Sequence, residues 1–370
     1  VTLFLTEGMS LKEWDRLGLL EREMALYERL MDEFSIQVFS YGDVGDLYYE
    51  SHFSDLRVLI IPYYRYYLTF KNRFHLVRAL WALKRSDLFK TNQVSGAEVA
   101  LHYSRKFHIP LLARCGYLLS VFKGKHESHE SDIEKARALE QRVFTGADAV
   151  ATSSYRDKEY VSKQYDVSKD KIYEVPNYVN QDLFYPTHKQ REEGHLLFIG
   201  RLDSQKNLSN LLNAVENSNS VKRLTIIGRG NLERQLKAQA ANITTVDINL
   251  LGAQPNESLP EYLRTCTLFV LPSLYEGLPK SLLEAMSCGC GCIGTNVEGI
   301  KEVITHGKDG WLCDTDAVSL AKAIDTLIED KHLRKRLGNH AVETIKNKYS
   351  LTKISLAEKK LYEHLIYYSN

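Results

Sequence analysis

The chain has 370 residues, of which 44% are hydrophobic and 26% are charged, and its formal net charge is +1. This composition is typical of a soluble globular protein. The length exceeds the size at which a single hydrophobic core stops growing, which predicts two domains. The near-zero net charge argues against a protein that binds nucleic acid over its whole surface.

The sequence predicts a protein of the cytoplasm. Its first residues read as a strand ending at Gly8, too short and wrongly flanked for a signal peptide. No apolar stretch of the sequence approaches the length of a membrane span. The six cysteines are too few for a disulfide scaffold in a chain of this length. A peripheral position on the cytoplasmic face of a membrane is compatible with these features.

The first half of the chain alternates short apolar runs with amphipathic segments. A long segment at residues 11–34 is predicted as one helix. This alternation predicts a doubly wound domain with a parallel sheet. The predicted strands are residues 1–5, 36–41, 56–62, 109–114, 147–154 and 171–176.

Residues 63–85 form a basic segment with interleaved aromatic residues. It contains six basic residues, no acidic ones, and Tyr, Phe and Trp side chains. An ordinary helix with aromatic core positions has this composition. A surface that docks on an anionic membrane has it too, and so does one that stacks on single-stranded nucleic acid. No nucleic-acid fold motif accompanies the segment, so we expect no nucleic-acid partner.

The second half contains three strand-loop-helix units, after a polar linker at residues 186–194. In the first unit, Arg201 and Lys206 follow the apolar run 196–199. A planar guanidinium and a compact ammonium together suit a diphosphate. In the second unit, Gly228 and Gly230 follow residues 223–227, which indicates a tight turn or a close backbone approach.

The third unit places two carboxylates after the apolar run 268–271. Glu276 lies on a loop before a predicted helix at residues 279–289, and Glu284 lies inside that helix. Ligands of open α/β sheets collect at the carboxyl ends of strands, and a helix N-terminus attracts anions. The two carboxylates could therefore hold the hydroxyl groups of a sugar and a ribose. The alternative is an acid in the N-terminal turn of the helix and a separate, solvated helix acid.

In order, these units resemble the donor-binding half of the family 4 glycosyltransferases. The resemblance is strong over residues 195–345 and loose over residues 1–170, with residues 174–184 similar to the family's crossing between domains. The matching positions are Gly200, Arg201, Leu202 and Lys206; Gly228 and Gly230; Pro272, Ser273, Glu276 and Gly277; and residues 283–286, 294–304 and 307–312.

The resemblance implies a GT-B fold, in which two Rossmann-like doubly wound parallel-sheet domains face a cleft. The domains would be residues 1–185, which bind the acceptor, and 186–345, which bind the nucleotide sugar. A helix at 346–370 would pack back on the first domain. The implied activity is retaining transfer from a nucleoside-diphosphate sugar to a glycan or lipid-linked acceptor, in polysaccharide or glycolipid synthesis.

The resemblance also implies roles for individual residues. Arg201, Lys206 and Glu276 would be catalytic, with Glu276 on the donor sugar. Either Arg201→Ala or Lys206→Ala would lower transfer by orders of magnitude and leave the fold intact. The base would lie near residues 247–254. The donor-binding residues would be Gly200, Gly228, Gly230, Gly277, Leu278, Pro279, Lys280 and Glu284, joined by Gly8, Met9 and Ser10 of the first domain.

One departure from the family lies in the first domain. Many relatives carry a histidine after a mid-domain strand, where this chain has residues 113–117 without one. Arg114 and Tyr117 are the candidates to replace it. His126 and His129 follow in a polar loop and are more typical of a solvated loop than of a catalytic or metal pair.

We expect neither a metal nor another cofactor. Cys288, Cys290 and Cys292 lack the paired spacing and the fourth ligand of a zinc site, and they suit packing in a helix end and the next strand.

The sequence leaves three other functions open. They are a nucleotide-sugar epimerase or phosphorylase on the same fold, a dinucleotide oxidoreductase, and a non-catalytic nucleotide-sugar-binding protein. An oxidoreductase would require a third glycine after Gly228 and Gly230, which is absent at position 233. A glycosidase would require Glu276 and Glu284 to flank one bond.

Overall fold

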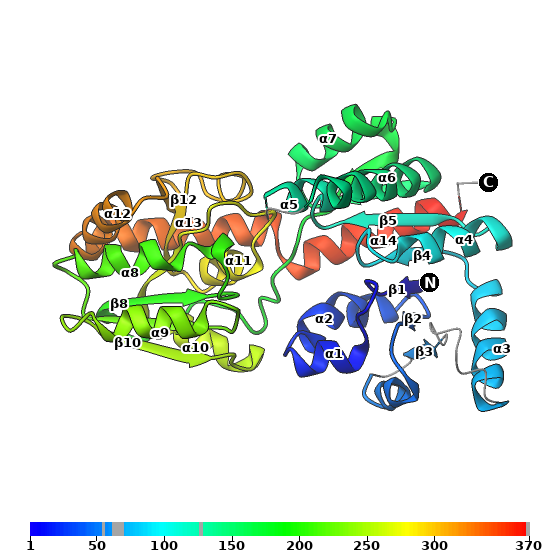
Figure 1. The fold of residues 1–370 in the computed structure, drawn as a ribbon, viewed down its shortest axis with the longest axis horizontal. Helices are drawn as coiled ribbons and strands as arrows, with labels where there is room; N and C mark the ends of the chain where they lie inside the picture. The colour runs from blue at the N-terminus through cyan, green and yellow to red at the C-terminus, as the bar shows by residue number, and fades with distance from the viewer. Residues whose placement is uncertain (54–55, 61–69, 126–128, 368–370) are drawn as a thin grey trace. The chain divides into compact units, whose positions relative to one another are not determined.

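The computed structural model describes residues 1–53, 56–60, 70–125 and 129–367, and the side chains at 60 and 70–76 are outside the description. The chain forms two compact units (Figure 1). Unit 1 contains Val1–Pro176 together with Ile354–Asn370, and unit 2 contains Asn177–Lys353.

Unit 1 is built on a seven-stranded parallel sheet in the order β3-β2-β1-β4-β5-β6-β7. The order reverses between β1 and β4, which is the switch point at which such sheets bind ligands. All six strands predicted for this half are confirmed, and β4 was missed. The strands are β1 (Thr2–Phe4), β2 (Gln37–Ser40), β3 (Arg57–Ile60), β4 (Phe89–Thr91), β5 (Leu111–Cys115), β6 (Ala149–Thr152) and β7 (Ile172–Glu174).

One predicted helix of unit 1 is in fact two. The segment 11–34 breaks at Gly18, which adopts φ +66°, a left-handed conformation that ends a helix. The helices are α1 (Leu11–Arg16), α2 (Leu20–Met31), η1 (Val44–Glu50), α3 (Phe70–Lys84), α4 (Ala97–Phe107), α5 (Leu119–Lys125), α6 (Glu130–Gly146), α7 (Tyr155–Tyr165) and η2 (Lys169–Lys171).

The C-terminal helix α14 (Leu351–Tyr367) belongs to unit 1 from Ile354 onward. It runs alongside β4, drawn red beside cyan in Figure 1. Lys90 of β4 donates a 2.8 Å hydrogen bond to Glu358 of α14, and both side chains are buried. Burial lowers the pKa of Lys90 because it disfavours the charged ammonium. This buried ion pair links the end of the chain to the centre of the first sheet.

Unit 2 is built on a six-stranded parallel sheet in the order β10-β9-β8-β11-β12-β13, which reverses between β8 and β11. The two sheets confirm the predicted pair of doubly wound α/β domains. The strands are β8 (Glu192–Ile199), β9 (Arg223–Ile227), β10 (Asp247–Gly252), β11 (Cys266–Leu271), β12 (Gly291–Thr295) and β13 (Trp311–Cys313). The helices are η3 (Ser204–Lys206), α8 (Leu208–Glu216), α9 (Glu233–Ala241), η4 (Asn256–Ser258), α10 (Leu259–Thr265), α11 (Lys280–Ser287), α12 (Ala317–Glu329) and α13 (Lys331–Lys348).

The units divide between Pro176 and Asn177, which is before the boundary expected between residues 185 and 186. Residues 177–185 lie in unit 2, where they pack and form hydrogen bonds. Phe184 is buried in the core of unit 2, and its carbonyl accepts a hydrogen bond from Ser287 of α11. At the other end, α13 extends to Lys348, beyond the expected boundary at 345 and 346.

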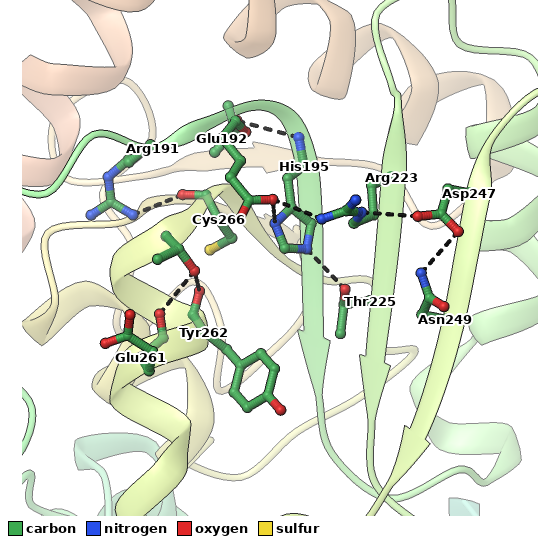
Figure 2. A network of polar contacts seen from close by, with 12 residues as sticks. Arg191, Glu192, His195, Arg223, Thr225, Asp247, Asn249, Glu261, Tyr262 and Cys266 are labelled. Carbon is green, nitrogen blue, oxygen red and sulfur yellow. Dashed lines mark hydrogen bonds and ion pairs between the residues drawn. The ribbon is translucent and has the colours of Figure 1, made fainter.

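A polar network surrounds His195 at the amino-terminal ends of β8, β9 and β10 (Figure 2). The His195 ring is buried, with Nε2 2.8 Å from Thr225 Oγ1 and Nδ1 3.2 Å from Glu192 Oε2. Arg223 donates to Glu192 and to Asp247, in each case at 2.9 Å. This network lies at the opposite end of the sheet from the carboxyl ends of the strands.

Burial lowers the pKa of His195, with Glu192 acting in the opposite direction. The unfolded chain therefore takes up a proton at a higher pH than the folded chain. Stability from the neutral ring is fully present above the ordinary histidine pKa of about 6.5 and is lost as the pH falls toward the lower folded value. We expect the free energy of unfolding to decrease more steeply below that pH in the wild type than in His195→Gln, as measured by urea denaturation. Equal slopes would contradict this assignment.

Candidate active site

The residues predicted to bind a donor follow two neighbouring strands of unit 2. Arg201 and Lys206 come after β8, and Glu276 comes after β11, which pairs with β8 in parallel. The sheet order reverses between these two strands. The fold thus brings the two loops to one edge of the sheet, at its switch point.

Lys206 and Glu276 form a buried ion pair between the two loops. Their Nζ and Oε1 atoms are 2.5 Å apart, and the side chains are 11% and 7% exposed. Ser273 also donates to Oε1, at 2.6 Å. An ammonium group has three donors, and the bond to Glu276 uses one of them. The other two could donate to a ligand.

Gln205 joins the remaining members of the cluster. Its Nε2 donates to the carbonyl of Tyr275 at 2.8 Å and to Glu276 Oε2 at 3.2 Å. Its Oε1 accepts from the guanidinium of Arg201 at 3.2 Å. Arg201 is itself 64% exposed and lies 3.3 Å from Asp203. The structure thereby brings together Arg201, Lys206 and Glu276.

The carboxylate of Glu276 has an acceptor position that its hydrogen bonds to the described residues do not use. Oε1 accepts from Lys206 and Ser273, and Oε2 accepts from Gln205. A carboxylate has roughly four acceptor positions. Among the described residues these contacts leave one position, on Oε2, for a hydroxyl group.

The glycines of the second unit bring the backbones of two loops together. Gly228 has φ +145°, and a Cβ there would lie 1.8 Å from the carbonyl oxygen of Gly200. A Cβ on Gly230 would lie 2.2 Å from the carbonyl oxygen of Leu202. The close approach expected of these glycines is therefore to the loop after β8, which carries Arg201.

The loop before α11 is supported in a similar way. A Cβ on Gly299 would lie 1.8 Å from the carbonyl oxygen of Gly277, so only glycine allows this packing. Leu278 is buried, and its carbonyl accepts a 2.7 Å hydrogen bond from Asn177. Pro279 is the N-cap of α11 and makes no side-chain cap.

Lys280 and Glu284 both lie on α11. Lys280 begins the helix, and its ammonium lies 5.4 Å from the centre of the Tyr178 ring. Glu284 lies one turn further on and is 2% exposed. Glu284 lies in the helix that follows the Glu276 loop, and its part in binding remains a prediction.

The predicted loop of unit 1 follows β1 at the switch point of the first sheet. Gly8 has φ +76°, Met9 donates its amide to Thr6, and Ser10 caps α1 by accepting from the amide of Glu13 at 3.0 Å. The amides of the next two residues, Leu11 and Lys12, donate to the buried Asp46 at 3.1 and 3.2 Å. An anion at this helix would therefore compete with a buried carboxylate.

Arg114 and Tyr117 lie in different surroundings. Arg114, on β5, donates to the carbonyl of Val175 at 3.0 Å and lies 3.9 Å from Glu358. These contacts place its guanidinium in the buried network of Lys90 and α14. Tyr117 follows β5 and packs its ring against Phe122, with centroids 5.2 Å apart. Their role in place of a histidine stays a prediction.

The three alternating cysteines pack in the core. All three are buried: Cys288 is the C-cap of α11, Cys290 lies between α11 and β12, and Cys292 lies in β12. Within the described residues, no group of three or more His, Cys, Asp or Glu side chains is arranged to hold a metal ion. Over the same residues, no helix is both long enough and apolar enough to cross a bilayer.

Three residues that shape this site were not among the predicted site residues, namely Gln205, Ser273 and Gly299. Each lies inside a segment that was recognised. Gln205 and Gly299 contact another loop, whereas Ser273 bonds Glu276 three positions away. Gln205 meets Glu276 across 71 positions, for example. A polar residue directly beside the predicted cation Lys206 was the available signal for Gln205.

Comparison with known proteins finds similar sequences and folds. Residues 181–344 match the family model described as glycosyl transferases group 1. An uncharacterised glycosyltransferase of Methanocaldococcus jannaschii is 28% identical over 62% of this chain and 64% of its own length. A UDP-Gal:alpha-D-GlcNAc-diphosphoundecaprenol alpha-1,3-galactosyltransferase of Escherichia coli is 29% identical over 57% and 58% of the two chains. This chain thus spans less than two thirds of either relative.

Among solved structures, the chain is similar to the Anabaena protein HepE in complex with UDP and glucose. The TM-score is 0.75 at 17% identity, covering 97% of this chain and 98% of HepE. At this identity the similarity shows the fold. Residues 181–344 of the chain therefore match the model of glycosyl transferases group 1, and the chain has a two-domain GT-B fold.

Proposed function

We propose that the protein is a glycosyltransferase that moves a sugar from a nucleoside-diphosphate sugar to a glycan or lipid-linked acceptor. The observation that carries this proposal is the cluster of Arg201, Lys206 and Glu276 at the switch point of unit 2. The two cations suit the diphosphate of a nucleotide sugar, and the fixed carboxylate suits the hydroxyl groups of its sugar. HepE was solved with UDP and glucose on the same fold, which supports this class of donor.

The chemistry follows from where charge develops. As the bond to the anomeric carbon breaks, the leaving diphosphate gains negative charge. Arg201 and the two further donors of Lys206 would stabilise this charge, with Lys206 largely buried and Arg201 exposed. The open acceptor position on Glu276 would hold a sugar hydroxyl. Since Lys206 neutralises Glu276 at 2.5 Å, the carboxylate is a poor candidate for a nucleophile.

Thermal denaturation with a panel of UDP-, GDP- and ADP-sugars tests the donor class, because binding to the folded state raises the apparent melting temperature. We expect one nucleotide sugar to give a clear increase in the apparent melting temperature. The corresponding nucleoside diphosphate without the sugar should give a smaller increase. The same samples are then assayed for transfer to glycan and lipid-linked acceptors. Release of free sugar without an acceptor would favour an epimerase or phosphorylase instead. No shift with any donor would contradict the proposal.

Retention of the anomeric configuration is part of the proposal. It is supported by the resemblance to the retaining family and by the neutralised Glu276, which suits front-face attack assisted by the leaving phosphate. Proton NMR of the first product formed would show the anomer of the donor. A product with inverted anomeric configuration would contradict retention, but it would leave the proposed sugar transfer standing.

We also propose that unit 1 contacts an anionic membrane that carries the acceptor. The relative from Escherichia coli is named for a diphosphoundecaprenol acceptor, which is a lipid-linked substrate. Of the basic segment, residues 63–69 lie outside the described residues. On α3 the exposed Val77 and Trp81 are accompanied by Arg85, whose guanidinium lies 4.3 Å from the Trp81 ring centre.

Charge reversal of Arg73, Arg78, Lys84 and Arg85 tests the membrane contact. Because the attraction is electrostatic, we expect the variant to lose binding to vesicles containing anionic lipid, while neutral vesicles bind neither protein. Arg78 already pairs with Glu50 at 3.0 Å, so its share of the effect is expected to be the smallest. Unchanged partitioning to the anionic vesicles would refute the contact.

A further inference from the structure

Gln205 is an uncharged polar side chain that is buried where two loops meet. It is 2% exposed and lies between the loop after β8 and the loop after β11. Its backbone carbonyl accepts from the amide of Leu274 at 2.8 Å, and its side-chain amide donates to the carbonyl of Tyr275 at 2.8 Å. One residue thus joins the two loops through both its backbone and its side chain.

The orientation of this amide is fixed by its neighbours. Nε2 must face the carbonyl of Tyr275 because a carbonyl can only accept. Oε1 is then turned toward the guanidinium of Arg201, which can only donate. The same Nε2 lies 3.2 Å from Oε2 of Glu276. A single amide therefore orients the cation on one loop and the carboxylate on the other.

We propose that Gln205 is a positioning residue, which holds Arg201 and Glu276 in the relative geometry that transfer requires. This inference rests on the proposed glycosyltransferase function. Arg201 is 64% exposed and would otherwise sample many rotamers, so a neutral buried acceptor restricts where its charge lies. Displacement of a reacting group by about 1 Å can lower a rate by about a hundredfold.

Gln205→Met tests the role with a side chain of similar length that neither donates nor accepts. We expect kcat to decrease by about ten- to a hundredfold, with a much smaller change in the KM of the donor, because the substitution removes hydrogen bonds that align groups for the reaction. The matched control is Gln239→Met. Gln239 also donates to a carbonyl, that of Ser209 at 3.1 Å, but it lies on α9. We expect its kcat to equal that of the wild type.

Gln205→Glu supplies a second readout, which a purely structural role would not produce. The introduced carboxylate faces Glu276 and the Tyr275 carbonyl on one side and Arg201 on the other, with Asp203 and Lys206 in the same turn. Once protonated, the introduced carboxyl can again donate one hydrogen bond, to either the Tyr275 carbonyl or Glu276. We expect its kcat, relative to wild type, to rise as the pH is lowered from about 8 to about 5.5, where a carboxyl facing another carboxylate takes up a proton.

The outcomes separate this inference from the proposed function. If the wild type transfers no sugar, the function fails and the inference falls with it. If the wild type is active and both variants retain its kcat, only the role of Gln205 is overturned. A parallel loss in Gln239→Met, or a Gln205→Glu variant with the pH profile of the wild type, would also overturn it. If Gln205→Met does not fold, the pH profile of Gln205→Glu decides alone.

Discussion

Arg201→Ala and Lys206→Ala are each expected to lower transfer by about two to three orders of magnitude, because each removes a donor to the charge that develops on the leaving diphosphate. Their effects on stability should differ. Arg201 is 64% exposed, so its removal should change the free energy of unfolding by less than about 0.5 kcal/mol. Steady-state kinetics and urea denaturation of each variant measure the two effects.

Lys206→Ala should also destabilise the fold, which corrects the expectation from the sequence. Its removal leaves the buried carboxylate of Glu276 without its cation, and breaking such a pair costs about 3–5 kcal/mol. Lys322→Ala and Arg336→Ala, on exposed faces of α12 and α13, are the matched controls. Near wild-type turnover in Arg201→Ala or Lys206→Ala would remove that residue from the proposed mechanism.

Lys90→Met is expected to be among the most destabilising single substitutions in unit 1. Lys90 and Glu358 are 1% and 0% exposed, so the substitution strands a fully buried carboxylate. The expected loss is about 3–5 kcal/mol in the free energy of unfolding. Chemical denaturation of the full chain measures it.

The double variant Lys90→Met/Glu358→Gln should recover part of this loss, since the buried carboxylate that lost its ammonium is replaced by a neutral amide. Lys135→Met is the control, because Lys135 pairs with Asp132 at the surface and should contribute at most about 1 kcal/mol. A loss in Lys90→Met no larger than that of the control would show that the ion pair does not hold α14 to β4.

The sequence predicted six of the seven strands of the first sheet, because each lies in a segment rich in apolar residues. The missed strand, β4, has three residues with Lys90 in the middle. Its charge is compatible with a central strand only because Glu358 neutralises it from 268 positions away. A pattern read along the chain contains no trace of that partner.

In the candidate site, too, the sequence predicted some features and missed others. Arg201, Lys206 and Glu276 were predicted because each lies in a recognisable motif on a loop that follows an apolar strand, and the structure brings the three together. The hydrogen bonds that fix them were not predicted. Gln205 reaches Glu276 from the other loop, and Ser273 bonds Glu276 within the same loop, three positions away. In unit 1, the cap of α1 by Asp46 was equally hidden, because Asp46 reaches the amide of Leu11 from 35 positions further along.

The central claim is that Arg201, Lys206, Glu276 and Glu284 act on one sugar nucleotide. A crystal structure with the nucleotide sugar that gives the largest thermal shift tests it most directly. We predict diphosphate oxygens within hydrogen-bonding distance of Arg201 and Lys206, a sugar hydroxyl on Oε2 of Glu276, and the ribose beside Glu284. A donor bound elsewhere in the protein, with these four side chains making no contact to it, would contradict the account.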